Sequence, residues 1–287
     1  MSIKESELIL NPDGSIYHLN LKPEHIADTV VFVGDQDRVA LVTKHFDSIE
    51  FETQKREFKT ITGTLKGKRI SVISTGIGTD NIDIVLNELD ALVNIDFKTR
   101  TIKSKLKSLN LIRIGTSGAL QPDIPIDSFL ISAYGLDISG MLHAYQTQNI
   151  SNPKMEAAFI THTNWDTNKA KPLIIEGSTA LISKFESSNT IKGVTATANG
   201  FYGPQGRVLR LKLNDVNLNN KMDNFTFANT KITNLEMETA GIYGLAKLLG
   251  HHTISLNAII ANRAHGTFSK NPLQTIENLI TYTLDRI

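Results

Sequence analysis

The feature that most constrains the fold is the alternation of strand-like and helix-like segments along the whole chain. The apolar run DTVVFVGD (28–35) is typical of a buried strand ending in a turn, and QDRVALVTKHF (36–46) follows as a predicted helix. The same order recurs in KITNLEMETAGIYGLAKLLG (231–250), before the late strand HHTISLNAIIANR (251–263). This alternation predicts an α/β fold with a central, largely parallel or mixed sheet, distorted toward a barrel and flanked by helices.

The segments between these also have recognisable periods. REFKTITGTLKGKRISVISTG (56–76) predicts two strands joined around Gly67, and apolar positions from Ile82 to Val93 mark one face of a helix. LNLIRIGTSG (109–118) predicts a strand that ends in a glycine-rich turn. Further predictions are a strand at 127–135, a helix around 179–187, a strand at 192–197, a helix within 219–229 and a helical C-terminus. The remainder of 145–190 has no clear pattern.

No Pro- or Ser-rich linker and no internal repeat interrupts the sequence, so residues 1–287 are predicted to form one domain. Residues 1–16 are predicted to be a polar N-terminal arm. The stretch 95–108 is rich in lysine and arginine, and we interpret it as a solvated surface excursion. Anion steering or a subunit contact is the alternative for this stretch.

The charge balance and the absence of cysteine exclude several classes of protein. Lys plus Arg (30) nearly equals Asp plus Glu (29), which gives no electrostatic reason to expect nucleic acid or membrane as a partner. With no cysteine, a disulfide framework and a thiolate metal site are excluded, and a reducing cytoplasm is the expected location. No signal peptide or membrane-spanning segment is predicted.

Five segments that follow predicted strands are candidates for a site, because ligands of α/β sheets bind beyond strand ends. In VGDQDR (33–38), Gly34, the helix-start amides and Arg38 would attract an anion, although a glycine turn capped by Asp35 is the structural alternative. STGIGTDN (74–81) lacks the third glycine of a dinucleotide fingerprint, which argues against a nicotinamide cofactor.

Two further segments place charges where they need partners. Arg113 lies within the apolar strand IRIGTSG (112–118), so either a structural salt bridge or a bound phosphate must neutralise it. NLEMETAG (234–241) places Glu236 and Glu238 at a strand-to-helix junction. These carboxylates would either cap the helix or bind the vicinal hydroxyls of a sugar.

The fifth segment is the turn FYGPQGR (201–207). Gln205 offers a carbonyl acceptor and an amide donor, and Arg207 offers only donors, so together they complement the carbonyl, N–H and carbonyl edge of uracil. An ordinary loop pair is the alternative. The sequence contains no P-loop, HExxH or GxSxG motif, which argues against several common hydrolase classes.

In their order along the chain, these segments resemble the hexameric nucleoside phosphorylase superfamily and, within it, the uridine phosphorylases. The resemblance runs from about Tyr17 to the C-terminus, and it rests on YHLNL, GDQDR, REF, STGIG, RIGTSG, FYGPQGR, EMETA and NR. It implies a site shared between two subunits. Phosphate would be held by Gly34, Arg38, Arg113 and Thr116, with Arg56 from the neighbouring subunit. Ribose would be bound by Glu236, Met237 and Glu238, with His18 from the neighbouring subunit. Uracil would be bound by Gln205, Arg207, Ile260, Ala261 and a stacking Phe201, with Arg263 supporting the pair behind the base.

The activity that the resemblance implies is reversible phosphorolysis of uridine to uracil and ribose 1-phosphate in pyrimidine salvage, with deoxyuridine and thymidine as further candidate substrates. Phosphate would be the second substrate, with no metal or organic cofactor, and a homodimer, able to build a hexamer, would be the minimal active unit. Stretch 95–108 looks like an insertion. Purine-specific members place an aspartate after the late strand, whereas IIANRAHG (259–266) has no acid and favours a pyrimidine. The alternatives are a purine nucleoside phosphorylase or nucleosidase of the same fold, and an inactive nucleoside-binding protein.

Overall fold

The computed structural model describes residues 2–287. The first strand predicted from the sequence is present as β1 (Thr29–Val33), which lies in the middle of the sheet. Its side chains alternate between two buried cores, as expected for a strand covered on both faces. Val30 and Phe32 join one core, and Val31 and Val33 join the other. Helices therefore have to cover both faces of the sheet around β1.

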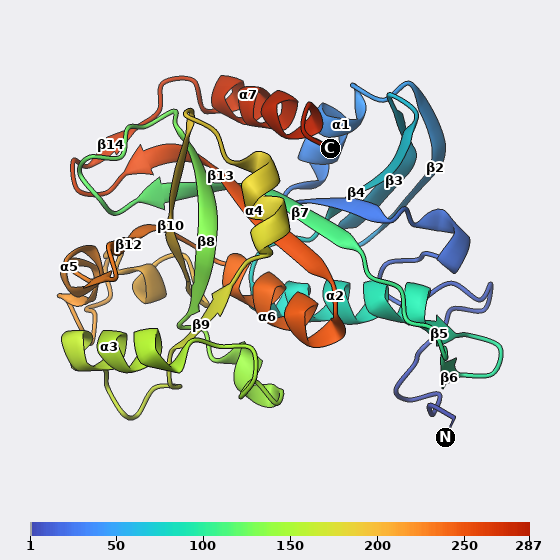
Figure 1. Ribbon diagram of the computed structural model, residues 1–287, viewed down its shortest axis with the longest axis horizontal. Helices are drawn as coiled ribbons and strands as arrows, with labels where there is room; N and C mark the ends of the chain where they lie inside the picture. The colour runs from blue at the N-terminus through green and yellow to red at the C-terminus, as the bar shows by residue number, and fades with distance from the viewer. Residues whose placement is uncertain (1) are drawn as a thin grey trace.

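One mixed sheet of twelve strands forms the centre of the molecule (Figure 1). Its order is β11-β12-β10-β8-β13-β7-β1-β4-β3-β2, with β9 on β8 and β14 on β13. The bounds are β1 Thr29–Val33, β2 Ser48–Lys55, β3 Phe58–Leu65, β4 Lys68–Ser74, β7 Asn110–Ala119, β8 Phe129–Asp137, β9 Leu173–Glu176, β10 Thr190–Thr197, β11 Thr226–Phe227, β12 Thr230–Glu236, β13 His252–Asn262 and β14 Thr267–Phe268. Because β12 also pairs with β7, strands β7, β13, β8, β10 and β12 close into a ring, which confirms the predicted barrel-like distortion.

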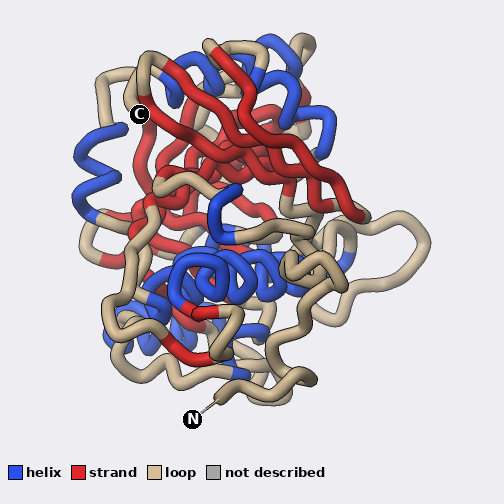
Figure 2. The backbone as a smooth tube through the Cα atoms, turned by 90° about the vertical axis from the view of Figure 1, so that its right-hand side faces the viewer, coloured by secondary structure: helices blue, strands red, loops and turns tan. Residues whose placement is uncertain are grey.

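The helices form two layers about this sheet, as Figures 1 and 2 show. One core includes residues of α2 and α6, and the opposite core includes residues of α1, α4 and α7. Their bounds are α1 Gln36–Thr43, α2 Thr79–Asn94, α3 Pro153–Thr163, α4 Thr179–Phe185, α5 Leu218–Asp223, α6 Thr239–Leu249 and α7 Pro272–Leu284, with short 3-10 turns η1 Pro23–His25, η2 Met141–Ala144 and η3 Gly203–Gln205. None of the helices in residues 2–287 is both long and apolar enough to cross a membrane.

One local prediction is wrong, and several elements were not predicted. The segment Gly115 to Gly118 is not a turn, because β7 continues through it to Ala119. Strand β2 was not predicted. It is an edge strand with no buried residue, and its apolar residues at alternate positions are only Ile49 and Phe51, too few to mark a strand. In the unassigned region the structure contains α3 and the four-residue β9.

The basic stretch 95–108 is more structured than a solvated excursion. It forms a small hairpin, β5 (Ile95–Asp96) with β6 (Thr101–Ile102), beside the N-terminal arm (Figure 1). Arg100 donates from Nε to the carbonyl of Ile3 at 2.9 Å, and Ile3 N donates back to the Arg100 carbonyl at 2.7 Å. The hairpin therefore holds the arm, while its lysines at 98, 105 and 107 are exposed.

Candidate functional site

A cavity of about 780 Å³ lies among the segments singled out by the sequence. This volume is within the range of small-molecule sites. All the predicted site residues line it except Arg56, His18 and Arg263. The lining residues are Gly34, Asp35, Gln36, Asp37, Arg38, Glu57, Gly76, Ile77, Asn81, Arg113, Thr116, Ser117, Gly118, Phe201, Gln205, Arg207, Leu235, Glu236, Met237, Glu238, Ile260, Ala261 and Phe268.

The cationic part of the cavity consists of Gly34, Arg38, Arg113 and Thr116. Gly34 follows β1 directly, and α1 then begins with Asp35 as its cap, since the Asp35 carboxylate accepts from Asp37 N at 2.9 Å. Burial lowers the pKa of Arg38, and the nearby charge of Arg113 lowers it further. Within residues 2–287 the Arg38 side chain makes no ion pair, so its guanidinium is available to an anion.

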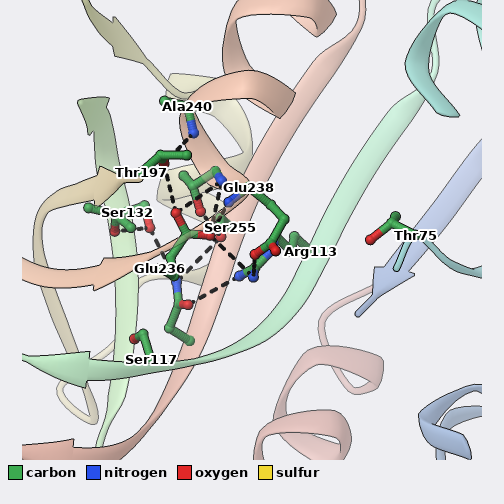
Figure 3. Close-up of polar contacts among 12 residues, drawn as sticks. Thr75, Arg113, Ser117, Ser132, Thr197, Glu236, Glu238, Ala240 and Ser255 are labelled. Atoms are coloured by element: carbon green, nitrogen blue, oxygen red, sulfur yellow. Dashed lines mark hydrogen bonds and ion pairs between the residues drawn. The ribbon is translucent and has the colours of Figure 1, made fainter. Parts of the chain in front are cut away.

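Arg113 is only 7% exposed, and a glycine makes its position possible. Its guanidinium lies over Gly115, where a Cβ atom would come within 1.8 Å of Nη1. Figure 3 shows its partners: Nη2 donates to Glu238 Oε2 at 2.5 Å and lies 3.2 Å from Glu236 Oε2. Burial would lower the pKa of Arg113, but these two carboxylates outweigh it and raise the pKa. The structure thus contains the first of the two alternatives for Arg113, a structural salt bridge, on the wall of the cavity.

Glu236 serves the start of helix α6. Its oxygens accept from Glu238 N at 3.0 Å, from Thr239 N at 3.0 Å and from the Thr197 hydroxyl at 2.7 Å (Figure 3). Burial raises the pKa of Glu236, and the charge of Arg113 opposes that rise. The helix-capping alternative for this acid is therefore present in the structure.

Glu238 is held differently, between two other segments of the wall. It is 6% exposed, and its Oε1 accepts from Gly78 N at 2.8 Å while Oε2 accepts from Arg113. Gly78 has a φ of +92°, in the range that favours glycine, and it precedes α2. Glu238 and Met237 thus face the cavity from the β12–α6 junction, with both Glu238 oxygens fixed by donors.

The turn part of the cavity is built on η3. Gly206 follows it with a φ of +70°, a conformation that returns Arg207 toward Gln205. Gln205 is 2% exposed, and its Oε1 accepts from Arg207 Nη1 at 2.6 Å. The predicted carboxamide and guanidinium pair is therefore present as one hydrogen-bonded unit.

Phe201 is placed differently from the prediction of a ring stacking on a base. Its ring is half-exposed and carries the Arg207 guanidinium, whose central carbon lies 3.8 Å from the ring centroid. Arg207 Nη1 also donates to the Phe201 carbonyl at 2.6 Å. In this structure Phe201 thus supports the guanidinium through a cation–π contact.

Three predicted residues lie outside the cavity lining. Arg263 Nη2 donates to the Gln205 backbone carbonyl at 2.5 Å, behind the pair, and burial together with the charge of Arg207 lowers its pKa to about 10. His18 bonds through Nδ1 to Glu88 at 2.7 Å. Arg56 is exposed in the turn between β2 and β3. Arg263 thus lies behind the Gln205–Arg207 unit, whereas His18 and Arg56 lie away from the cavity of their own chain.

Asn257 and Phe268 are among the residues near the site that were not predicted. Asn257 in β13 accepts from Arg113 Nη1 at 3.1 Å, and its signal was a single carboxamide within the apolar run ISLNAII, where a buried polar group needs a partner. Phe268 of β14 lines the cavity, although it is exposed and no periodicity marked it.

Comparison with known proteins gives a consistent result. Residues 28–281 match the model of the phosphorylase superfamily. A uridine phosphorylase of Thermococcus kodakarensis is 30% identical over 258 residues, which are 90% of this chain and 81% of that protein. A DeoD-type 2 purine nucleoside phosphorylase of Shewanella oneidensis is 27% identical over 93% of this chain and 96% of its own length.

The fold comparison agrees. The crystal structure of a Trypanosoma brucei nucleoside phosphorylase, said to show uridine phosphorylase activity, has a TM-score of 0.86 at 25% identity, and covers 98% of this chain and 100% of its own. The two chains therefore share the whole ring of strands and its helices, and not only a local motif. With the family model spanning nearly all of the sequence, the chain belongs to the phosphorylase superfamily.

Proposed function

We propose that this protein is a uridine phosphorylase, which cleaves uridine with inorganic phosphate to give uracil and ribose 1-phosphate. The observation that carries the proposal is one cavity that holds both two guanidinium groups, half-buried Arg38 and buried Arg113, and the Gln205–Arg207 unit. The first suits an oxyanion, and the second suits the polar edge of a pyrimidine. Relatives and a solved structure named for this activity support the same reading.

In the proposed reaction, a phosphate oxygen forms a bond to the anomeric carbon as the bond from that carbon to uracil N1 breaks. The electron pair of the broken bond leaves with uracil, whose carbonyl oxygens gain negative charge, while the ribose becomes cationic. Gln205 Nε2 and Arg207 Nη2 make no hydrogen bond within residues 2–287, so they are the donors available to those oxygens. Their contacts would strengthen in the transition state and so increase turnover.

The other residues that line the cavity would position the phosphate, the ribose and the base. Arg38, Arg113 and Thr116 would align the phosphate, with the charge of Arg113 already balanced by Glu238 before substrate arrives. Glu238 and Met237 would contact the ribose. Ile260 and Ala261 would line the side of the base. Phosphate is the second substrate, and the reaction includes no redox step.

The residues at the end of β13 favour a pyrimidine base. Purine nucleoside phosphorylases match as much of this chain as uridine phosphorylases do, so overall similarity does not choose the base. Asn262 is 2% exposed, donates to the carbonyls of Gln121 and Ile124, and accepts from His265 N. The N–H groups of its carboxamide are already donated to these carbonyls, and a carboxamide is too weak an acid to protonate a purine ring nitrogen.

We further propose that the minimal active unit is a homodimer, which can assemble into a hexamer. Arg56 and His18 lie outside the cavity of their own chain, and in this proposal each is given to the neighbour's phosphate and ribose. Arg56 is exposed, and its side chain makes no hydrogen bond or ion pair within residues 2–287, as expected of a group that acts elsewhere.

The test is a spectrophotometric screen of uridine, deoxyuridine, thymidine, inosine and adenosine, each with and without phosphate. Uridine is expected to be cleaved only when phosphate is present, with uracil and ribose 1-phosphate in equal amounts. Equal cleavage without phosphate would identify a nucleosidase. Faster cleavage of inosine or adenosine would contradict the choice of base, and binding of uridine without release of uracil would identify a binding protein.

A further inference from the structure

One glutamine connects the cationic part of the cavity to the turn that carries Arg56. Gln36 is the first residue of α1, and its side chain lines the cavity. Its Nε2 donates to the backbone carbonyl of Arg56 at 2.6 Å, and its Oε1 accepts from Gln54 Nε2 at 3.0 Å. Both polar groups of the Gln36 side chain therefore bond to the β2–β3 hairpin, although Gln36 belongs to helix α1, which begins beside Gly34.

The turn that Gln36 holds has an unfavourable backbone. Arg56 has a φ of +54°, a left-handed conformation that residues with a Cβ rarely adopt. On its other flank, the carbonyl of Glu57 accepts from the Ser74 hydroxyl at 2.6 Å. Lys55 and Phe58 pair across this two-residue turn, a hairpin geometry that itself favours a positive φ, and the two side-chain bonds to the turn carbonyls hold it further.

The backbone of Arg56 is held by its own chain, whereas its side chain is not. Its backbone carbonyl is bonded to Gln36, while its exposed guanidinium makes no hydrogen bond or ion pair within residues 2–287. An arginine that serves another subunit must leave its own chain from a fixed point, because the entropy of a loose turn would be lost on each binding event. The bond from Gln36 supplies that fixed point.

We propose that Gln36 is a positioning residue for Arg56, so that phosphate affinity at the neighbouring site depends on Gln36 of this chain. The inference rests on the proposed sharing of Arg56 between subunits. In this proposal, the hydrogen bond from Gln36 to Arg56 joins the start of α1, beside the phosphate site of one chain, to the arginine that the same chain supplies to its neighbour.

The variant Gln36→Met tests this, because it keeps the length of the side chain and removes both bonds. Titration of the full-length variant with inorganic phosphate in a calorimeter is expected to show a phosphate Kd about tenfold higher than that of the wild type. This is the size of effect expected from losing the hydrogen bond to Arg56. The matched control is Gln54→Met, which removes only the outer bond of the same chain and should change the phosphate Kd less than about twofold. The uridine KM of Gln36→Met should also change less than about twofold, since Gln36 would not contact the nucleoside.

A double-mutant cycle decides whether Gln36 acts through Arg56. In an Arg56→Ala background, Gln36→Met is expected to leave the phosphate Kd unchanged, because the arginine it positions is gone. Additive effects would mean that Gln36 contacts phosphate itself and would overturn the proposal, as would an unchanged Kd in the single variant. Gln36→Ala removes the same bonds with a better helix former, and it replaces the methionine variant if that protein unfolds.

Calorimetry also separates this inference from the proposed function. Wild-type protein that binds phosphate with the predicted dependence on Gln36 and Arg56, yet does not cleave uridine, would refute the activity alone. If the protein cleaves uridine, but the phosphate Kd is the same in the wild type and in Gln36→Met, the positioning role alone is refuted. Protein that binds no phosphate would refute both.

Discussion

Arg113 shows how a single residue can carry a charge into an apolar strand. Its neighbours in β7 are Ile112 and Ile114, which are buried, and the guanidinium is accommodated because Gly115 has no side chain on the same face. Glu238 and Asn257 then bond to it from two other elements. A charge held in this way is already oriented before an anion arrives, and preorganisation of this kind favours catalysis.

The first prediction concerns Gly115. In Gly115→Ala the new methyl group would occupy the position of Arg113 Nη1, so the guanidinium must leave its partners. We expect the phosphate KM to rise at least about tenfold and the free energy of unfolding to fall by about 3 kcal/mol, because a buried ion pair is broken. Steady-state kinetics and urea unfolding measure the two effects.

Gly118→Ala is the matched control for that variant. It lies in the same strand, and its added methyl would come no closer than 3.4 Å to the Arg263 side chain. Near-normal phosphate KM and stability are expected. If both alanine variants behaved alike, the contact between Gly115 and Arg113 would not be what places the arginine.

The second prediction concerns Arg207. Arg207→Ala removes the guanidinium from the Gln205–Arg207 unit and leaves the cationic part of the cavity intact. We expect kcat with uridine to fall about 100-fold, the usual effect of losing one donor to a developing oxyanion, while the phosphate KM changes less than about twofold. Initial rates at varied phosphate and varied uridine measure these constants, and similar losses in both would contradict the assignment.

At this scale the sequence predicted the identity of the site residues better than their contacts. Arg113, Glu238, Gln205 and Arg207 were recognisable because a charge in a strand or a polar pair in a turn needs a partner. The stacking of Arg207 on Phe201 was not predictable, because it depends on the fold of the turn rather than on residue type. A glutamine at the start of a helix, such as Gln36, gives no signal until the hairpin it contacts is placed.

Among the elements, the N-terminal arm and the β5–β6 hairpin depend on each other. Arg100 donates to the carbonyls of Ile3, Lys4 and Leu8, and its own carbonyl accepts from Ile3 N. A stretch that composition marked as a solvated surface thus organises the chain that leads to His18. The hydrogen bonds use the guanidinium and the backbone, so the lysines around them remain exposed.

The third prediction follows from this contact. Arg100→Ala should free the arm and increase the rate of tryptic cleavage after Lys4 about tenfold or more, since several hydrogen bonds of about 1 kcal/mol each are lost. Mass spectrometry of timed digests measures the rate. Lys98→Ala is the control, because Lys98 is exposed in the same hairpin and should leave the rate unchanged; an unchanged rate in Arg100→Ala would show that other contacts hold the arm.

Several elements with a buried apolar face were predictable, although α3 and β9, which also have buried residues, were not. Strands β1, β8 and β13 and helices α2 and α6 have apolar positions at the expected spacing, which the hydrophobic effect enforces. Strand β2 has only half-buried residues on its inner face, Phe51, Thr53 and Lys55, so its apolar pattern is too short to indicate a strand. The segment after Arg113 has two glycines and suggested a turn, whereas one of them is required inside β7 by the arginine beside it.

On the scale of the whole molecule, closure of the sheet brings the two halves of the cavity together. The antiparallel pairing of β12 with β7, through Leu235 and Gly118, joins the strand that carries Glu236 to the strand that carries Arg113. Residues separated by more than a hundred positions thus share one wall, as Arg113 and Glu238 do. Long-range pairing of this kind is set by topology, which sequence periodicity does not encode.

The last prediction tests whether the site is shared between subunits. Arg56→Ala and Glu238→Ala homodimers are expected to be nearly inactive, and mixing them with subunit exchange should restore activity. Half of the dimers would then be mixed, and each mixed dimer would have one intact site, made of Glu238 from one subunit and Arg56 from the other. The expected recovery is about a quarter of wild-type activity, as follows from a two-fold symmetric interface.

The control for the mixing experiment replaces Glu238→Ala with the double variant Arg56→Ala/Glu238→Ala. No combination of that subunit with Arg56→Ala contains an intact site, so activity should stay at the level of the separate proteins. Native mass spectrometry shows in both cases whether mixed dimers form. Because Arg56 lies outside the cavity of its own chain, recovery requires the second subunit to supply it. Mixed dimers without recovery would place Arg56 in its own site or outside the reaction.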